Sequence, residues 1–135
     1  MVQTLTFIDT SGFFSSLSKD DRSHKKTLEI LSDSRRRFMT TDWILGETLN
    51  LLTARKRHHL GIQFLERIEE SKILNTLTID SDHFELSKKL FIKFKDQQFP
   101  FTDCTSFVMM KEYKIIDALT ADRHFKVMGF NPLIG

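Results

Sequence analysis

Several residue types that mark particular protein classes are scarce in this chain of 135 residues. Its one cysteine, Cys104, excludes an intramolecular disulfide and a cysteine-based zinc site. No apolar run approaches the ~18 residues that a membrane helix needs. The first residues lack the basic start and long apolar core of a signal peptide. We therefore expect a cytoplasmic protein that does not enter a membrane.

The remaining composition is that of a folded protein, with 40% hydrophobic and 28% charged residues. The length suits a single domain over residues 1–135, which would bury roughly 68% of its unfolded surface. The net charge of +2 is weak evidence for a nucleic-acid partner, but the basic residues are clustered. Such clusters are by default solvated faces, and as RNA-phosphate contacts they are nonspecific. The two clusters contain Arg35, Arg36, Arg37, Arg55, Lys56 and Arg57.

Short β-branched or aromatic runs alternate with longer amphipathic stretches along the chain. Strands are expected at 4–8, 37–40, 73–79 and 115–119, with a marginal strand at 133–134. Thr41 or Asp42 should cap the helix after the second strand, and Gly61 should separate that helix from the next. After Pro100, Thr102 or Asp103 should open another helix. Helices between strands imply right-handed crossovers, hence a mostly parallel α/β sheet covered on both faces.

Four acidic residues occupy related places in this pattern. Asp9 directly follows the first strand, and Asp122 lies just past the fourth. Glu47 lies in the second turn of the helix after the second strand, and Asp103 opens the helix that leads to the fourth. Ligands bind beyond the carboxyl ends of parallel strands, so all four can meet at one edge. A group of carboxylates needs a cation, and oxygen ligands favour Mg²⁺ or Mn²⁺. The sequence thus predicts a metal-dependent enzyme that cleaves phosphodiester bonds.

Simpler roles compete for these acids. Asp9, Asp103 and Asp122 also suit helix caps, although one oxygen of a capping carboxylate remains free for a metal. Glu47 is harder to explain structurally, because no lysine or arginine stands three or four residues away to pair with it. Asp117 lies within the fourth strand and is left unassigned.

Polar neighbours of the acids are candidates for holding them in place. The Ser11 hydroxyl would serve Asp9 or a phosphate, and Thr120 would orient Asp122, although ordinary turn hydroxyls explain both equally well. His124 follows Asp122 by two positions, where a structural role is the simpler interpretation. No motif marks Cys104 as a nucleophile, so a small core residue is expected there.

Four segments together resemble the PIN domain, and more narrowly the VapC-type toxins of bacterial toxin–antitoxin pairs. These segments are FIDTS, LGETLNLL, FTDCTSF and ALTADRHF, and the resemblance extends from Asp9 to Gly129. It implies a three-layer α/β/α domain and an endoribonuclease that depends on Mg²⁺ or Mn²⁺. The acidic quartet of the family falls on Asp9, Glu47, Asp103 and Asp122, and its hydroxyl positions fall on Ser11 and Thr120. Family members often carry a further acid where this chain has His124. Toxin members commonly form homodimers and are inhibited by a small antitoxin protein that inserts into the active-site groove.

The hypothesis for the chemistry is in-line hydrolysis of RNA that leaves a 5′-phosphate and a 3′-hydroxyl. Asp9, Asp103 and Asp122 would bind one ion, and Glu47 would shape a second site or orient a water, so one or two ions remain open. The substrate would be tRNA, rRNA or mRNA. Alternatives are rRNA or mRNA processing, flap-DNA cleavage, and an inactive nucleic-acid-binding module. A phosphoacceptor receiver module would need paired acids after the first strand, where this chain has Asp9 alone.

Overall fold

A five-stranded parallel sheet forms the centre of the molecule. The structure is a computed structural model, and it describes residues 3–135. The strand order is β3-β2-β1-β4-β5, and every pairing is parallel. The predicted α/β class with a parallel sheet is therefore confirmed. The strands are β1 (Thr4–Ile8), β2 (Arg36–Thr41), β3 (Leu74–Leu77), β4 (Asp117–Leu119) and β5 (Asn131–Pro132).

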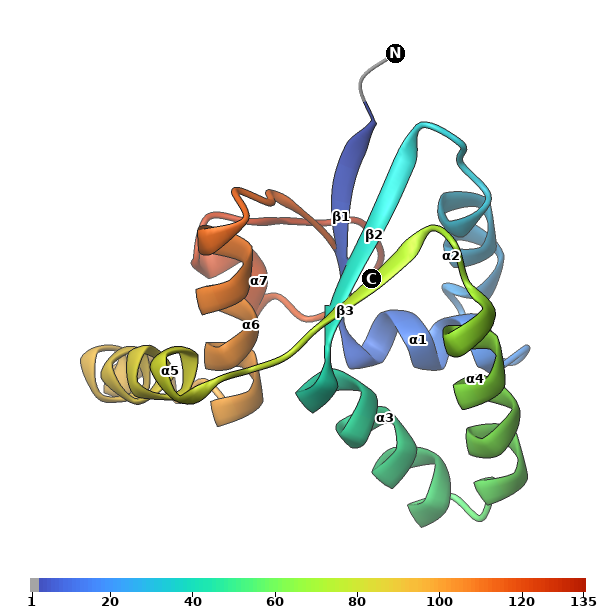
Figure 1. Ribbon diagram of the computed structural model, residues 1–135, viewed down its shortest axis with the longest axis horizontal. Helices are drawn as coiled ribbons and strands as arrows, with labels where there is room; N and C mark the ends of the chain where they lie inside the picture. The colour runs from blue at the N-terminus through green and yellow to red at the C-terminus, as the bar shows by residue number, and fades with distance from the viewer. Residues whose placement is uncertain (1–2) are drawn as a thin grey trace.

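Helices cover both faces of this sheet, as the predicted three-layer arrangement requires (Figure 1). On one side lie α6 and α7 with α5 packed outside α6, and on the other lie α1, α2 and α4. Among residues 3–135 no helix is both long and apolar enough to cross a bilayer. The helices are α1 (Thr10–Leu17), α2 (His24–Leu31), α3 (Asp42–Ala54), α4 (His58–Glu70), α5 (Ser81–Lys93), the 3₁₀ turn η1 (Lys95–Gln97), α6 (Phe101–Glu112) and α7 (His124–Val127).

The middle strand, β1, ends inside the core. It lies between β2 and β4, so helices cover both of its faces and its last residues read as a continuous apolar run. Phe7 and Ile8 are buried, together with Phe38 of β2, Leu119 of β4 and Phe107 of α6. The residue that follows β1 is therefore held at a buried position.

The two outer strands of the sheet, β3 and β5, differ from the expected residue ranges. The third strand is shorter than the expected 73–79, because β2 ends at Thr41, opposite Leu77, and offers no partner beyond that pair. The last strand was expected at 133–134 but forms at Asn131–Pro132, where it pairs with Asp117 and Ala118 of β4. The following amides still donate to main-chain oxygens of this region, outside the regular ladder.

One helix boundary agrees with the sequence prediction, and two others differ from it. Thr41 caps α3, as predicted, by accepting a hydrogen bond from the Ile44 amide at 3.1 Å. Gly61 does not separate two helices but lies inside α4, where an added Cβ would come within 3.3 Å of Leu49 on α3. The chain breaks instead near Lys56, which has a φ of 59°. The sixth helix begins at Phe101, so Asp103 lies in its first turn rather than at its cap.

Gly12 lies where α1 packs closely against the sheet. A Cβ at this position would lie 2.3 Å from the main-chain oxygen of Leu119, which cannot move without disturbing β4. Gly12→Ala should therefore destabilise the protein by about 1–3 kcal/mol or more, as overpacking does. Thermal denaturation checks this, with Gly46→Ala as the matched helical control.

Gly46 lies on α3, and a Cβ added there would have nothing within 4 Å, so alanine should stabilise the protein by roughly 0.5–1 kcal/mol. Equal melting temperatures for the two variants would show that α1 does not approach β4 as closely as described.

Candidate active site

The carboxyl ends of β1 and β4 bring the first and last acids together. Ile8 pairs with Leu119 at the end of the two strands, and the Asp9 amide donates to the Leu119 carbonyl at 3.2 Å. The chain leaves β4 through Thr120 and Ala121 and reaches Asp122 beside Asp9. Two carboxylates that are more than a hundred residues apart in sequence thus share one edge of the sheet.

All four predicted acids line a single pocket of about 340 Å³ at this edge. Glu47 reaches it from α3 and Asp103 from α6, while Thr10, Ser11 and Phe14 of α1 form another wall. Within residues 3–135, no lysine or arginine forms an ion pair with any of the four carboxylates. The pocket therefore concentrates negative charge without a described lysine or arginine to balance it.

Asp9 is the most enclosed member of the group, with 5% of its surface exposed. The Thr120 hydroxyl donates to its carboxylate at 2.8 Å, and the Ser11 hydroxyl lies 3.5 Å from the same oxygen. Burial raises the pKa of Asp9 to about 6; the Thr120 hydrogen bond opposes this rise, and the charges of Glu47 and Asp122 add to it.

Thr120 was expected to orient the carboxylate of Asp122, but its hydroxyl donates to Asp9 and accepts a hydrogen bond from the Asp122 amide at 3.0 Å.

Asp103 shows the strongest effect of crowding. It is 6% exposed in the first turn of α6. Burial raises its pKa to about 8, and the negative charges of Asp9 and Asp122 and a hydrogen bond with Asp122 contribute to the rise. A carboxyl group whose pKa is raised by burial and by neighbouring negative charges marks a place where a positive charge would be favoured.

Glu47 is the exposed member of the set and stands at the pocket wall. The hydroxyl of Thr10, the first residue of α1, donates to its carboxylate. This contact joins α3 to α1 and fixes the direction in which the Glu47 side chain points. Glu47 is therefore held toward the other acids, although its helix position is solvent-exposed.

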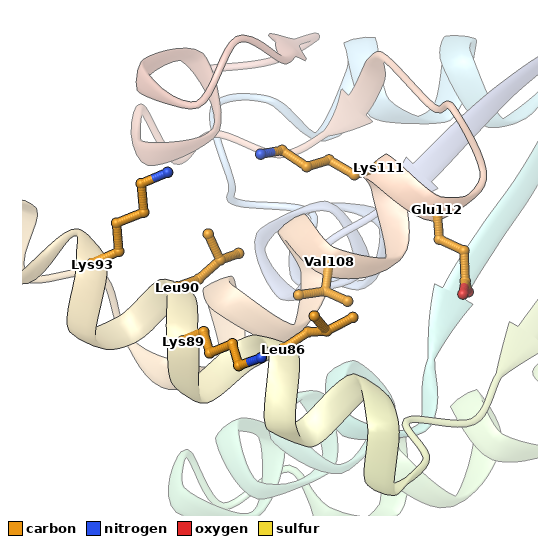
Figure 2. A pocket seen from close by; sticks show the side chains of 7 residues that line it. All are labelled: Leu86, Lys89, Leu90, Lys93, Val108, Lys111 and Glu112. Atoms are coloured by element: carbon orange, nitrogen blue, oxygen red, sulfur yellow. The ribbon is translucent and has the colours of Figure 1, made fainter.

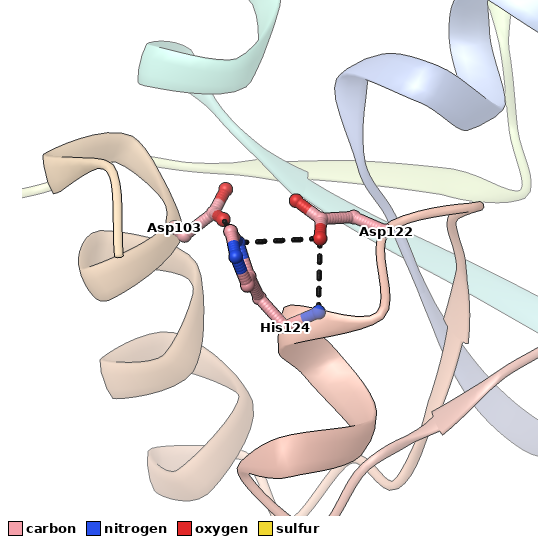
Figure 3. Close-up of side chains that lie close together, drawn as sticks. All are labelled: Asp103, Asp122 and His124. Atoms are coloured by element: carbon pink, nitrogen blue, oxygen red, sulfur yellow. Dashed lines mark hydrogen bonds and ion pairs between the residues drawn. The ribbon is translucent and has the colours of Figure 1, made fainter. Parts of the chain in front are cut away.

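A compact group of possible metal ligands includes two acids of the pocket and one neighbouring histidine. Asp103, Asp122 and His124 each offer one ligand atom, and the three atoms lie within 4.8 Å of one another (Figure 3). Asp9 and Glu47 line the same pocket outside this compact group. Carboxylate oxygens are the ligands that Mg²⁺ and Mn²⁺ prefer, and a divalent ion would offset the charge repulsion described above. The donor set thus fits a divalent cation.

Sequence reasoning missed one acid of the pocket. Asp21, in the loop between α1 and α2, lines it together with the quartet, and its carboxylate accepts a hydrogen bond from the Ser23 amide at 2.9 Å. The sequence around Asp21 reads as an ordinary polar loop. No local signal distinguished it, because only the path of that loop brings it to the sheet edge.

The two basic clusters lie at opposite ends of the sheet strands. Arg55 at the end of α3 lies over the Phe14 ring, 4.8 Å from its centroid, and Phe14 lines the pocket. Lys56 and Arg57 follow Arg55 in the turn to α4. The other cluster, Arg35 to Arg37, lies at the start of β2, which is the opposite edge of the sheet from the acids.

The arginines at this opposite edge are already paired. Arg36 binds Asp117 at 2.9 Å, which assigns Asp117 a structural role, and Arg35 binds Asp33 at 3.0 Å. Arg37 donates to the Lys72 carbonyl at 3.2 Å. Of the two basic clusters, the structure therefore brings the one that begins at Arg55 toward the acidic pocket.

Comparisons with known proteins identify the family and the fold of this chain. Residues 6–131 match the PIN domain family. The chain is 25% identical over 126 residues to the 23S rRNA-specific endonuclease VapC20 of Mycobacterium tuberculosis, covering 93% of this chain and 95% of that protein. The crystal structure of the M. tuberculosis VapC20 toxin, described as cleaving the sarcin-ricin loop, superposes with a TM-score of 0.87 at 24% identity, over 96% of this chain and 99% of that one.

A second solved structure is more distant in sequence. VapBC2 from Rickettsia felis, bound to a DNA fragment from its promoter, matches with a TM-score of 0.70 at 12% identity, over 96% of this chain and 97% of that chain. At this identity the match speaks for the fold alone. Because the family match covers nearly the whole chain and includes every residue of the acidic quartet, this protein belongs to the PIN domain family.

Proposed function

We propose that this protein is a divalent-metal-dependent endoribonuclease and the toxin of a toxin–antitoxin pair. One observation carries the proposal: four carboxylates, two of them buried, share one pocket of a PIN domain, and no lysine or arginine among residues 3–135 pairs with them. The likeness to VapC20, a 23S rRNA-specific endonuclease, supports RNA as the substrate class. The receiver-module alternative loses its basis, since the chain belongs to another family.

In this proposal the acids hold Mg²⁺ or Mn²⁺, with Asp103 and Asp122 nearest the ion and Asp9 and Glu47 completing the site. When bound, the ion would lower the pKa of a water molecule and neutralise charge on the phosphate. The side chains of the protein supply the positioning. Thr120 and Ser11 hold Asp9, and Thr10 directs Glu47 into the pocket, where its exposed carboxylate can accept a proton from the attacking water.

RNA would enter along the side of the pocket that carries Arg55. Its guanidinium, which lies over the Phe14 ring, would contact a backbone phosphate of the RNA, and Lys56 and Arg57 would extend the contact. Unpaired loops are the favoured target, since sequence-specific RNA readers bind mostly single-stranded bases.

The direct test is cleavage of purified substrates. Ribosomes, tRNA, mRNA and flap DNA are incubated with the protein and Mn²⁺, Mg²⁺ or EDTA, and the product ends are mapped. We expect metal-dependent cuts in RNA that leave 5′-phosphates and 3′-hydroxyls. Cleavage that persists in EDTA, or none on any RNA with either ion, contradicts the proposal. Preference for flap DNA or a precursor rRNA would favour a processing nuclease instead.

We propose a cognate antitoxin as the protein partner. The fold shared with VapBC2, a pair described together on promoter DNA, supports this. Co-expression of the gene with any small neighbouring open reading frame should give a stable complex with no ribonuclease activity. Full activity of the co-purified complex would contradict an antitoxin that occupies the active-site groove.

We also propose that the protein forms a homodimer through α5. This helix exposes Leu86, Phe91 and Ile92, the last at 69%, and its inner side packs against α6. A groove of about 440 Å³ runs between the two helices, with Leu86, Leu90 and Val108 at its centre and lysines at its rim (Figure 2). Exposed apolar surface of this kind, rimmed by polar residues, is typical of protein interfaces.

Light scattering during size-exclusion chromatography tests this dimer. The wild type should elute at twice its chain mass of 15.9 kDa, and Ile92→Glu should elute as the monomer, because a buried unpaired carboxylate opposes association. Ile62→Glu is the matched control, since Ile62 is 51% exposed on α4, on the opposite side of the sheet. A monomeric wild type would rule the dimer out.

A further inference from the structure

His124 contacts two acids of the pocket, Asp103 and Asp122, and the proposed chemistry has not used it. It is the first residue of α7, and its Nδ1 atom lies 3.2 Å from Asp103 Oδ2 and 3.2 Å from Asp122 Oδ1. Figure 3 shows the imidazole between the two carboxylates, with its nitrogen facing them. The side chain is 29% exposed, so a solvated ion can reach it.

Two contacts hold His124, one to its main chain and one to its ring. The His124 amide donates to Asp122 Oδ1 at 2.9 Å, which ties the first turn of α7 to that carboxylate. On another side, Phe99 contacts the ring in an edge-to-face arrangement, with the ring centroids 5.2 Å apart. Phe99 is itself buried, so it forms a rigid support. The imidazole is therefore held in place before any ligand arrives.

The spacing around Nδ1 matches that of adjacent ligands on one ion. An octahedral cation with ligands at about 2.1 Å keeps neighbouring ligand atoms about 3 Å apart, close to both measured distances. The lone pair of a neutral imidazole is a good ligand for first-row transition metals, whereas Mg²⁺ is bound mainly by oxygen. Replacing an oxygen ligand by nitrogen at this position would thus change which ion the pocket prefers.

We propose that His124 is a direct ligand of the ion held by Asp103 and Asp122, and that it shifts the preference of the pocket from Mg²⁺ toward Mn²⁺. This inference rests on the proposed metal-dependent function. The competing interpretation is a hydrogen-bond donor that only bridges the two carboxylates. The two interpretations differ in whether nitrogen bonds to the ion, and this can be measured without following RNA cleavage.

The first experiment is pulsed electron paramagnetic resonance of Mn²⁺ bound to the full-length protein. A directly bonded imidazole should give a nitrogen coupling, and this coupling should change when histidine alone is labelled with ¹⁵N. The coupling should vanish in His124→Ala and persist in His59→Ala, an exposed histidine on α4. Bound Mn²⁺ without a histidine coupling in the wild type overturns the inference and leaves the proposed function standing.

The second experiment is calorimetric titration with Mn²⁺ and with Mg²⁺. His124→Asp should retain binding but lower the preference for Mn²⁺ over Mg²⁺ by about tenfold, because an oxygen ligand replaces the nitrogen ligand. An unchanged ratio of the two affinities overturns the inference. If neither the wild type nor Asp103→Ala gives a heat of binding with either ion, both the inference and the metal-dependent function fail.

Discussion

Asp9→Asn is expected to remove ribonuclease activity and at the same time make the metal-free protein more stable. The loss of a carboxylate from the proposed metal site should lower cleavage by about 10³-fold, since metal assistance is worth several kcal/mol in the transition state. Stability should rise because the folded state no longer has to hold a buried charge beside Glu47 and Asp122. The raised pKa of Asp9, from 3.8 to about 6, corresponds to at most about 3 kcal/mol at neutral pH.

Asparagine suits this position sterically. Its carbonyl oxygen can accept a hydrogen bond from the Thr120 hydroxyl, as the aspartate carboxylate does. Its NH₂ group would face the remaining acids. Chemical denaturation in EDTA gives the stability, and cleavage of ribosomal RNA with Mn²⁺ gives the activity. Asp82→Asn is the control, because Asp82 is exposed in the first turn of α5, and it should change neither quantity strongly. An Asp9→Asn protein that is less stable than wild type, or still active, would contradict this account.

The second large effect is a loss of stability of the metal-free protein as the pH rises. Asp9 and Asp103 have folded-state pKa values of about 6 and about 8, both above the ordinary 3.8. Between the ordinary and the raised pKa the folded state binds more protons than the unfolded state, so the free energy of unfolding falls with increasing pH. The fall in the free energy of unfolding that is due to Asp9 is mostly complete by about pH 6. The fall that is due to Asp103 continues to about pH 8.

The range from pH 6 to pH 8 depends mainly on Asp103. Wild type in EDTA should lose stability across this range relative to Asp103→Asn, and both proteins are compared with His124→Ala added, because His124 contacts Asp103 and its titration would not cancel. Saturating Mn²⁺ should remove the difference in slope by stabilising the charged form, since an ion that binds only the folded state adds to its stability. Parallel pH profiles in EDTA would mean that Asp103 is not held in a crowded, buried pocket.

The acidic quartet could be anticipated because the position of a strand and of its end is a local consequence of the sequence. The run TLTFI predicts a buried strand, and a parallel sheet places whatever follows it at the ligand-binding edge. Asp9 and Asp122 follow directly from that rule. Glu47 followed from a different argument, the absence of a charged partner on its helix, and the structure places it against Thr10.

Other features could not be predicted, because they depend on contacts between distant parts of the chain. Asp21 reaches the pocket through a loop whose path no local pattern describes. The cluster at Arg35 to Arg37 was expected to be a solvated face or a nonspecific RNA contact, and its strand begins at the end of the sheet away from the acids, where Arg36 meets Asp117. Gly61 resembled a helix break, yet it serves the close approach of two helices.

The sequence by itself determined the α/β class, the parallel sheet and the edge where carboxylates gather, because alternation of apolar runs and the position of an acid after a strand are local properties. Only the tertiary structure decided how tightly these groups are packed and what surrounds them. The raised pKa values of Asp9 and Asp103 and the position of His124 between two acids arise from burial and from distances across α6, α7 and β1. Both are set by packing between elements, which no single stretch of sequence specifies.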